Sequence, residues 1–208
     1  MFFFQCRQLS NLSSKYDLPY YFFTISFLSY HEVDVDNATL PFVRIKKVTK
    51  IYNRKNGPAL DNVSLNFNQN QITALLGHNG AGKSSLLGIL TGLLRPTKGD
   101  CYIDGLSIRN DVFQARQTIG FCAQDNILYD RLTVFEHVQL FLRLKGQLAS
   151  KEEVVSLIQD VGLIDFLGVY SEALSGGNKR KLCLALALTG DEKQKLLIFD
   201  EPTSGMGK

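Results

Sequence analysis

The segment that most constrains this sequence is a glycine-rich stretch between two apolar runs. Residues 77–85 read Gly-His-Asn-Gly-Ala-Gly-Lys-Ser-Ser and contain the pattern G-x-x-x-x-G-K-[ST]. The run before it, 72–76, predicts a buried strand, and the run after it, 86–94, predicts a helix. Strand, glycine loop and helix in this order are the context of a phosphate-binding loop, because a helix N-terminus offers free N–H groups and a positive dipole end to an anion. The sequence therefore predicts a nucleoside triphosphate site.

The residue types in this loop assign expected roles. Glycines let the backbone curl so that successive N–H groups point inward at the phosphates. We expect Lys83 to reach the β- and γ-phosphates and the Ser84 hydroxyl to ligate Mg²⁺. The predicted ATP-binding residues of the loop are Gly77, His78, Asn79, Gly80, Ala81, Gly82, Lys83, Ser84 and Ser85.

Composition limits the other possibilities. A chain of 208 residues that is 45% hydrophobic and 21% charged is typical of one globular domain with a real core. A net charge of +3 is too small to indicate a nucleic-acid partner, so we expect none. The cysteines and histidines show no metal-ligand spacing; we expect the cysteines in apolar runs to be free core residues and the histidines to be solvated or in loops. These residues are Cys6, Cys101, Cys122 and Cys183, and His31, His78 and His137.

The first forty residues differ from the rest. They form an aromatic-rich connector whose apolar segment, 18–28, falls short of the roughly 20 residues that a spanning helix needs. We therefore expect no membrane span within residues 1–40. The density of Tyr and Phe leaves two interpretations open, a segment lying along a membrane interface or a plain linker.

From residue 41 to 208 the pattern predicts an α/β domain. Strands are expected at 43–52, 60–67, 101–103 and 119–123, with residues 63, 65 and 67 on one face. Capping boxes at Thr133 with Glu136 and at Ser150 with Glu153 start two helices that end near residues 146 and 162. A third helix is expected at 182–188, opened by residues 174–181, and the basic residues 179–181 are expected to form a solvated helix face rather than a nucleic-acid patch. The helices indicate a helical subdomain, about 125–180, inserted between strands of one sheet.

Carboxylates follow the last predicted strand. Residues 196–199 form an apolar run, and Asp200 and Glu201 follow it directly. Ligands of open α/β sheets bind at the carboxyl ends of the strands, so these two acids lie where a ligand is expected.

Five features taken in chain order resemble the ATP-binding domain of an ABC transporter. They are Tyr52, the 77–85 loop, Gln124, the sequence Leu-Ser-Gly-Gly at 174–177, and Asp200-Glu201. The loop and the segments 175–182 and 185–191 further resemble the A subfamily, whose full-length members move lipids and sterols. The resemblance implies a P-loop NTPase fold that hydrolyses ATP to drive transmembrane transport of lipids at the cytoplasmic face of a membrane.

The resemblance also implies roles for single residues. Tyr52 would stack on adenine, Asp200 would hold Mg²⁺ together with Ser84 and Gln124, and Gln124 would sense the γ-phosphate. Glu201 would polarise the attacking water, with Lys83 and Gln124 as the other catalytic residues. Ser175, Gly176 and Gly177 would contact the ATP of a second ATP-binding domain in a head-to-tail pair. The remaining implied partners are the transmembrane domains of the transporter.

Departures from the family pattern leave other readings open. Ala123 and Ser85 replace the usual Pro and Thr without an expected loss, but Gly207 stands where the family has Asp and the chain stops at Lys208. We therefore expect a fragment that is incomplete after the strand 196–199, and one that hydrolyses ATP poorly. The alternatives are a binding-only or inactive fragment, and a soluble ABC-type ATPase that acts on ribosomes or DNA.

Overall fold

A computed structural model of the chain describes residues 22–24, 41–53, 55, 57–69, 72–190 and 194–202. The expectations for most of residues 1–40, and for the altered position Gly207, lie outside the described residues. Within the described part the chain forms two units. The sheet unit comprises 22–24, 41–119 apart from the gaps, and 198–200; the helical unit comprises 120–190, 194–197 and 201–202. Each is described by itself.

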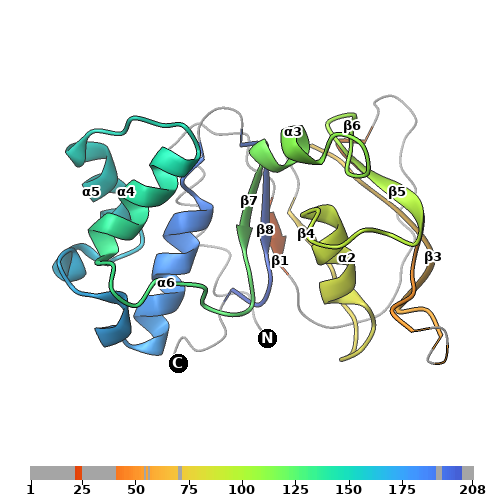
Figure 1. Cartoon of the computed structure of the whole chain (residues 1–208), viewed down its shortest axis with the longest axis horizontal. Coiled ribbons are helices and arrows are strands. Elements are labelled where there is room, and N and C mark those ends of the chain that lie inside the picture. The colour runs from red at the N-terminus through yellow and green to blue at the C-terminus, as the bar shows by residue number, and fades with distance from the viewer. Residues whose placement is uncertain are drawn as a thin grey trace. The chain divides into compact units, whose positions relative to one another are not determined.

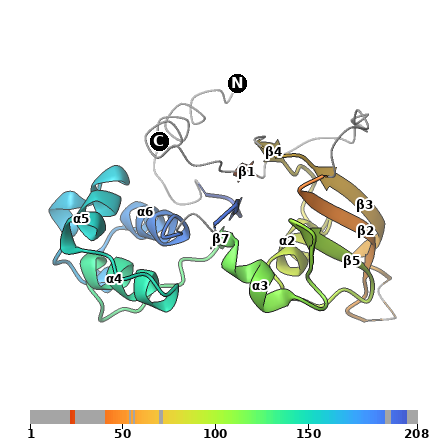
Figure 2. The ribbon, with the colours of Figure 1, turned by 90° about the horizontal axis from the view of Figure 1, so that it is seen from above.

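An antiparallel sheet is the main element of the sheet unit. Its strands are β2 (Val43–Lys50), β3 (Leu60–Phe67), β5 (Lys98–Ile103) and β6 (Leu106–Ser107), in the order β3-β2-β5-β6. All neighbouring strands run antiparallel. One face carries buried apolar side chains of β2 and β5, including Val43, Ile45 and Ile103, and the views show α2 on one side of this sheet (Figures 1 and 2). The predicted alternation in β3 is confirmed, since residues 63, 65 and 67 are less exposed than residues 62, 64 and 66 between them.

The glycine loop connects β4 (Thr73–Ala74) to α2 (Lys83–Leu90), and β4 pairs in parallel with β1 (Phe22–Thr24). The expected buried strand at 72–76 is wrong: only two residues are in strand, and Ile72 is 54% exposed. Apolar composition predicted burial, but burial depends on what covers the side chains, and even the paired residue Ala74 is exposed. The expected helix at 86–94 begins three residues earlier and ends at Leu90, because Gly92 adopts φ 70° beyond the C-cap. The short helix α3 (Val112–Gln117) completes this unit.

Three longer helices pack together in the helical unit. They are α4 (Val134–Leu144), α5 (Lys151–Asp160) and α6 (Gly176–Ala187), with short 3₁₀ turns at η1 (Ile164–Phe166) and η2 (Ser171–Ala173). Their shared core is made of aliphatic side chains: Val134, Val138, Leu142, Val154, Ile158, Leu163, Leu174, Leu182, Ala185 and Leu186 (Figure 1). Both predicted capping boxes are confirmed, with both hydrogen bonds of each box present. Helix α6 begins six residues before the expected start, because the Ser175 hydroxyl accepts a hydrogen bond from the Asn178 N–H and caps it.

The residues of two strands are divided between the two units. β7 (Ile119–Cys122) begins in the sheet unit and continues in the helical unit, whereas β8 (Leu196–Phe199) begins in the helical unit. All four residues of β8 are buried, as its apolar sequence predicts, and Asp200 follows directly. The structure therefore places the first of the two predicted carboxylates at the end of a buried strand.

Two expectations about polar residues are wrong. His137 is fully buried rather than solvated: its Nε2 accepts from the Tyr129 N–H at 2.9 Å, so its Nδ1–H donates to the Thr133 carbonyl. Arg180 is also fully buried, although a solvated basic run was expected there. The expectation of free core thiols is confirmed for Cys101, Cys122 and Cys183. Among the helices of the described residues, none has the length and apolar character needed to cross a membrane.

Candidate functional site

The loop at 77–82 is shaped by glycines in the left-handed region. Gly80 has φ 84° and Gly82 has φ 90°, conformations that L side chains rarely adopt. At Gly82 a Cβ would also overlap the Ala59 carbonyl and lie 2.7 Å from a Leu60 methyl group. The loop therefore needs glycine at residue 82 for both conformation and space.

Lys83 opens helix α2 and folds back over the loop. Its Nζ donates to the Gly77 carbonyl and, at 3.0 Å, to the His78 carbonyl. The ammonium therefore lies against the loop backbone, where phosphate oxygens could replace the carbonyl oxygens as acceptors. His78 is exposed and its Nδ1 lies 2.8 Å from the Asn79 carbonyl. The loop itself can thus hold an anion, and its lysine has the required position.

Tyr52 lies beyond the end of β2 and is joined to the start of α2. Its hydroxyl lies 3.1 Å from the Ser85 hydroxyl, and its ring is 60% exposed. The Lys50 Nζ lies 5.0 Å from the ring centroid. An exposed aromatic ring fixed at one edge can stack on a planar base. The structure thus brings Tyr52 to the loop residues, as the predicted nucleotide site requires.

Ser84 and Asp200 are the candidate Mg²⁺ ligands of the sheet unit. Ser84 is exposed in the first turn of α2, and Asp200 is 8% exposed after β8. Within the described residues, no group of three or more His, Cys, Asp and Glu side chains could hold a metal ion. This donor set fits Mg²⁺, which is usually held by one or two protein oxygens plus water and substrate phosphates.

Gln124 and Glu201 meet in the helical unit. The Gln124 Nε2 donates to the Glu201 Oε2 at 3.3 Å, and both side chains are exposed. Glu201 has φ 47°, a left-handed conformation that costs a residue other than glycine about 1–2 kcal/mol. Strained residues of this kind occur at functional sites, where the surrounding structure holds them. The structure thus brings together two residues that lie 77 positions apart in the sequence.

Arg180 holds the backbone on both sides of this pair, a role that sequence analysis missed. From helix α6 its Nη1 donates to the Ala123 carbonyl and, at 3.0 Å, to the Gln124 carbonyl. Its Nη2 donates to the Glu201 carbonyl at 2.8 Å and its Nε to the Pro202 carbonyl at 3.1 Å. The available sequence signal was its position three residues before the buried Cys183 on one face of α6.

The predicted signature sequence forms the N-terminus of α6. Ser175 and Gly176 are exposed, and Gly177 is half-buried. The N–H groups and positive dipole end of this twelve-residue helix are therefore accessible to an anion.

Comparisons with known proteins give one consistent result. A family model described as ABC transporter matches residues 60–204. The phospholipid-transporting ATPase ABCA3 of Homo sapiens is 45% identical over 168 residues, which are 79% of this chain and 10% of the relative. The retinal-specific phospholipid-transporting ATPase ABCA4 of Homo sapiens is 44% identical over 169 residues, 80% of this chain and 7% of the relative. The chain thus spans about a tenth or less of the length of these relatives.

Solved structures agree. The dimeric ATP-binding cassette MJ0796, in a post-hydrolysis state bound to ADP and Pi, has a TM-score of 0.72 and 29% identity, covering 80% of this chain and 76% of that one. A second dimeric structure of this bacterial ABC transporter cassette has a TM-score of 0.70 and 29% identity, with coverage of 79% and 76%.

Proposed function

Because the chain belongs to the ABC transporter family and has A-subfamily relatives, we propose that it binds and hydrolyses ATP to drive transport of lipids across a membrane. The observation that carries this proposal is the geometry of the 77–83 loop. Left-handed glycines open its backbone, and the Lys83 ammonium lies against its carbonyls. A triphosphate in this loop would exchange those carbonyls for stronger charge-assisted acceptors.

The proposed binding mode uses residues of the sheet unit. The loop N–H groups and the α2 dipole bind the phosphates, and Lys83 contacts the β- and γ-phosphates. Tyr52 stacks on adenine through its exposed ring. Ser84 and Asp200 of this unit would hold Mg²⁺, which would supply positive charge against the phosphates, and Gln124 of the helical unit is proposed as a further ligand.

The proposed chemistry is in-line attack of water on the γ-phosphorus, which forms a new P–O bond, breaks the bond to the oxygen bridging to the β-phosphate and releases ADP and phosphate. Glu201 accepts a proton from the water. Gln124 donates a hydrogen bond to the Glu201 carboxylate and thereby orients it toward the water. Proton acceptance needs the ionised carboxylate, which is the form that accepts the Gln124 hydrogen bond best. Arg180 keeps the two backbone segments in register without contacting the nucleotide.

We further propose that Ser175, Gly176 and Gly177 complete the ATP site of a second ATP-binding domain in a head-to-tail pair. The accessible N-terminus of α6 supports this role, and the structural neighbours are dimers. The transmembrane partners, the lipid cargo and a location at the cytoplasmic face of a membrane are proposed because the relatives are phospholipid-transporting ATPases.

Calorimetric titration and phosphate release test the proposal. Lys83→Ala should weaken ATP binding at least tenfold and leave adenosine binding within twofold, because only the phosphates lose a charged partner. Glu201→Gln should keep ATP binding and reduce phosphate release about 100-fold, because the amide cannot accept the proton. The matched control is Glu172→Gln, an exposed acid in η2.

The outcomes separate the alternatives. Equal loss of ATP and adenosine binding in the lysine variant would contradict the assigned role of Lys83. ATP binding by the unsubstituted chain with no phosphate release would leave a binding-only protein and remove the proposed hydrolysis.

A further inference from the structure

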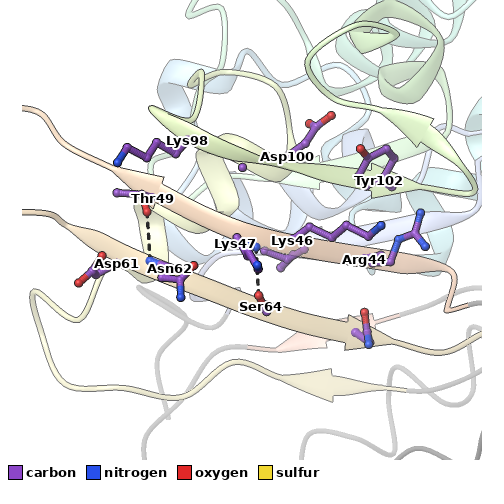
Figure 3. Close-up of a pocket in the computed structure, with 13 residues that line it drawn as sticks. Arg44, Lys46, Lys47, Thr49, Asp61, Asn62, Ser64, Lys98, Asp100 and Tyr102 are labelled. Atoms are coloured by element: carbon purple, nitrogen blue, oxygen red, sulfur yellow. Dashed lines mark hydrogen bonds between the residues drawn. The ribbon is translucent and has the colours of Figure 1, made fainter.

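A groove of about 1020 Å³ lies on the antiparallel sheet, over strands β3, β2 and β5 (Figure 3). Its charged lining consists of four cations and two carboxylates: Arg44, Lys46, Lys47, Lys98, Asp61 and Asp100. The rest of the lining is mainly uncharged polar residues contributed by β3 and β2. The groove therefore carries an excess of positive charge, and it uses none of the proposed nucleotide-binding residues.

A β-bulge in β2 creates much of this charge. In a regular strand Lys46 and Lys47 would point to opposite faces, one of them toward the core. Here both are exposed, because Lys47 has φ 48° and the register with β5 shifts between Lys46 and Thr49. Gly99 on β5 permits the bulge, since a Cβ there would overlap the carbonyls of both lysines. The bulge is further held by the Lys47 N–H, which donates to the Ser64 hydroxyl at 3.0 Å (Figure 3).

The two carboxylates offset only part of the charge of the four cations, and Asp100 is the β5 residue paired with Lys46. Asp100 accepts from the Cys101 N–H at 2.8 Å and from the Ser107 hydroxyl at 2.6 Å, so its oxygens are used at the β5–β6 turn. Asp61 lies at the end of the groove away from Arg44 (Figure 3). Among the described residues, the contacts of the Arg44 and Lys46 side chains are with an aromatic ring and not with a carboxylate.

One end of the groove carries a donor without an acceptor. The Arg44 guanidinium lies 4.9 Å and the Lys46 Nζ 5.5 Å from the centroid of the Tyr102 ring, so two like charges share one ring. Within the described structure the Arg44 Nε is buried and has no hydrogen-bond partner. A carboxylate bound beside Tyr102 would offset the repulsion between these two cations.

From these features we propose that the groove binds an extended acidic segment of a partner protein with acidic residues at alternate positions. Arg44 and Lys46 are two residues apart on one strand, so their Cα atoms are about 6.8 Å apart, the same spacing as alternate side chains of an extended ligand. Such a segment lying along β2 places successive carboxylates opposite successive cations.

Fluorescence anisotropy with the full chain tests the proposal. The probe is a labelled nine-residue peptide with Asp at odd and Thr at even positions, and one control peptide has the same composition with all Asp residues grouped at one end. The alternating peptide should bind at least fivefold tighter. Arg44→Gln and Lys46→Gln should each weaken binding of the alternating peptide by about two- to fivefold, because each substitution removes one charge pair. The matched control is Lys55→Gln, an exposed lysine of the same unit that does not line the groove.

Unchanged thermal midpoints and ATP affinity in the Arg44 and Lys46 variants would show that they are folded. Equal affinity for the two peptides, or no effect of either variant, would overturn the proposal. Arg44-dependent binding of inorganic phosphate, or of phosphatidylcholine vesicles with 20% phosphatidylserine, without tighter binding of the alternating peptide would also overturn it, in favour of a phosphate or membrane ligand.

Discussion

Replacing Arg180 by Met should destabilise the protein and slow hydrolysis while leaving ATP binding intact. Met has an unbranched, uncharged side chain that is shorter than that of Arg, so the change removes the hydrogen bonds and leaves some space unfilled. The lost donors serve the carbonyls of Ala123, Gln124, Glu201 and Pro202.

The loss in the free energy of unfolding depends on how many of these carbonyls would have neither a protein donor nor access to water. A net hydrogen bond from a charged donor contributes about 1.5–3 kcal/mol. Gln124 and Glu201 are exposed residues whose carbonyls water can reach, whereas Pro202 is buried and Ala123 is half-buried. Counting two bonds gives about 3–6 kcal/mol, and removing a buried charge returns part of this. We expect a loss of about 3 kcal/mol in the free energy of unfolding.

Urea unfolding and steady-state phosphate release measure the two effects. The free energy of unfolding should fall by about 3 kcal/mol, while the slope of this free energy against urea concentration should stay unchanged. The kcat should fall about 10- to 100-fold, because a misplaced base or orienting group costs this much, while the ATP dissociation constant stays within twofold. Arg180→Lys keeps the charge but cannot reach both segments, so it should recover stability in part and kcat little.

Lys179→Met is the control, since Lys179 precedes Arg180 on α6 and is only half-buried. Two results would refute the reasoning. One is a loss of less than 1 kcal/mol in the Arg180 variant. The other is a fall in kcat that the lysine variant restores completely, which would mean that charge alone is required.

Three further predictions rest on backbone geometry and capping. Gly82→Ala should cost about 3 kcal/mol or more and Gly80→Ala about 1–2 kcal/mol in thermal unfolding, because both glycines have positive φ but only Gly82 has a neighbour that a Cβ would overlap. Glu201→Gly should be about 1 kcal/mol more stable than Glu201→Ala at φ 47°, and equal stability would mean that this residue is not strained. The N–H and hydroxyl of Thr133 hold the pKa of Glu136 below its ordinary value of 4.5, so this carboxylate stabilises the fold fully above pH 4.5 and loses its effect as the pH falls through the lower folded pKa. The difference in thermal midpoint between wild type and Glu136→Ala should therefore shrink on acidification, and a difference that persists at pH 2 would contradict this.

Local signals in the sequence predicted local structure well. The capping boxes at Thr133 and Ser150 place the first residues of α4 and α5 correctly, because all their hydrogen bonds lie within four residues. The glycine loop is likewise specified by residues next to each other, and Gly82 has the left-handed conformation that the pattern demands. The start of α6 was missed because two glycines after Ser175 resemble a loop in sequence, although a capping hydroxyl allows them to begin a helix.

Distant contacts could not be predicted in this way. Arg180 looked solvated because its neighbours are lysines, but its acceptors lie 21 to 57 positions away and become adjacent only in the fold. The burial of His137 was also missed, although its hydrogen-bond partners Tyr129 and Thr133 lie only eight and four positions away. The opposite error occurred at Ile72, where an apolar run was read as buried although burial depends on what covers it.

The buried Arg180 holds the backbone of Glu201, which has a left-handed conformation. A glutamate at φ 47° would relax to an ordinary conformation unless its backbone were held, and the Glu201 carbonyl accepts from the Arg180 Nη2 at 2.8 Å. The same guanidinium holds the Gln124 carbonyl, so one cation on α6 fixes the backbones of two proposed catalytic residues. Because α6 begins at the proposed signature sequence, a displacement of this helix moves the Arg180 N–H groups that donate to both carbonyls. Contact of a second domain with Ser175 would therefore reach Gln124 and Glu201 through five residues of helix, without any change in the nucleotide loop itself.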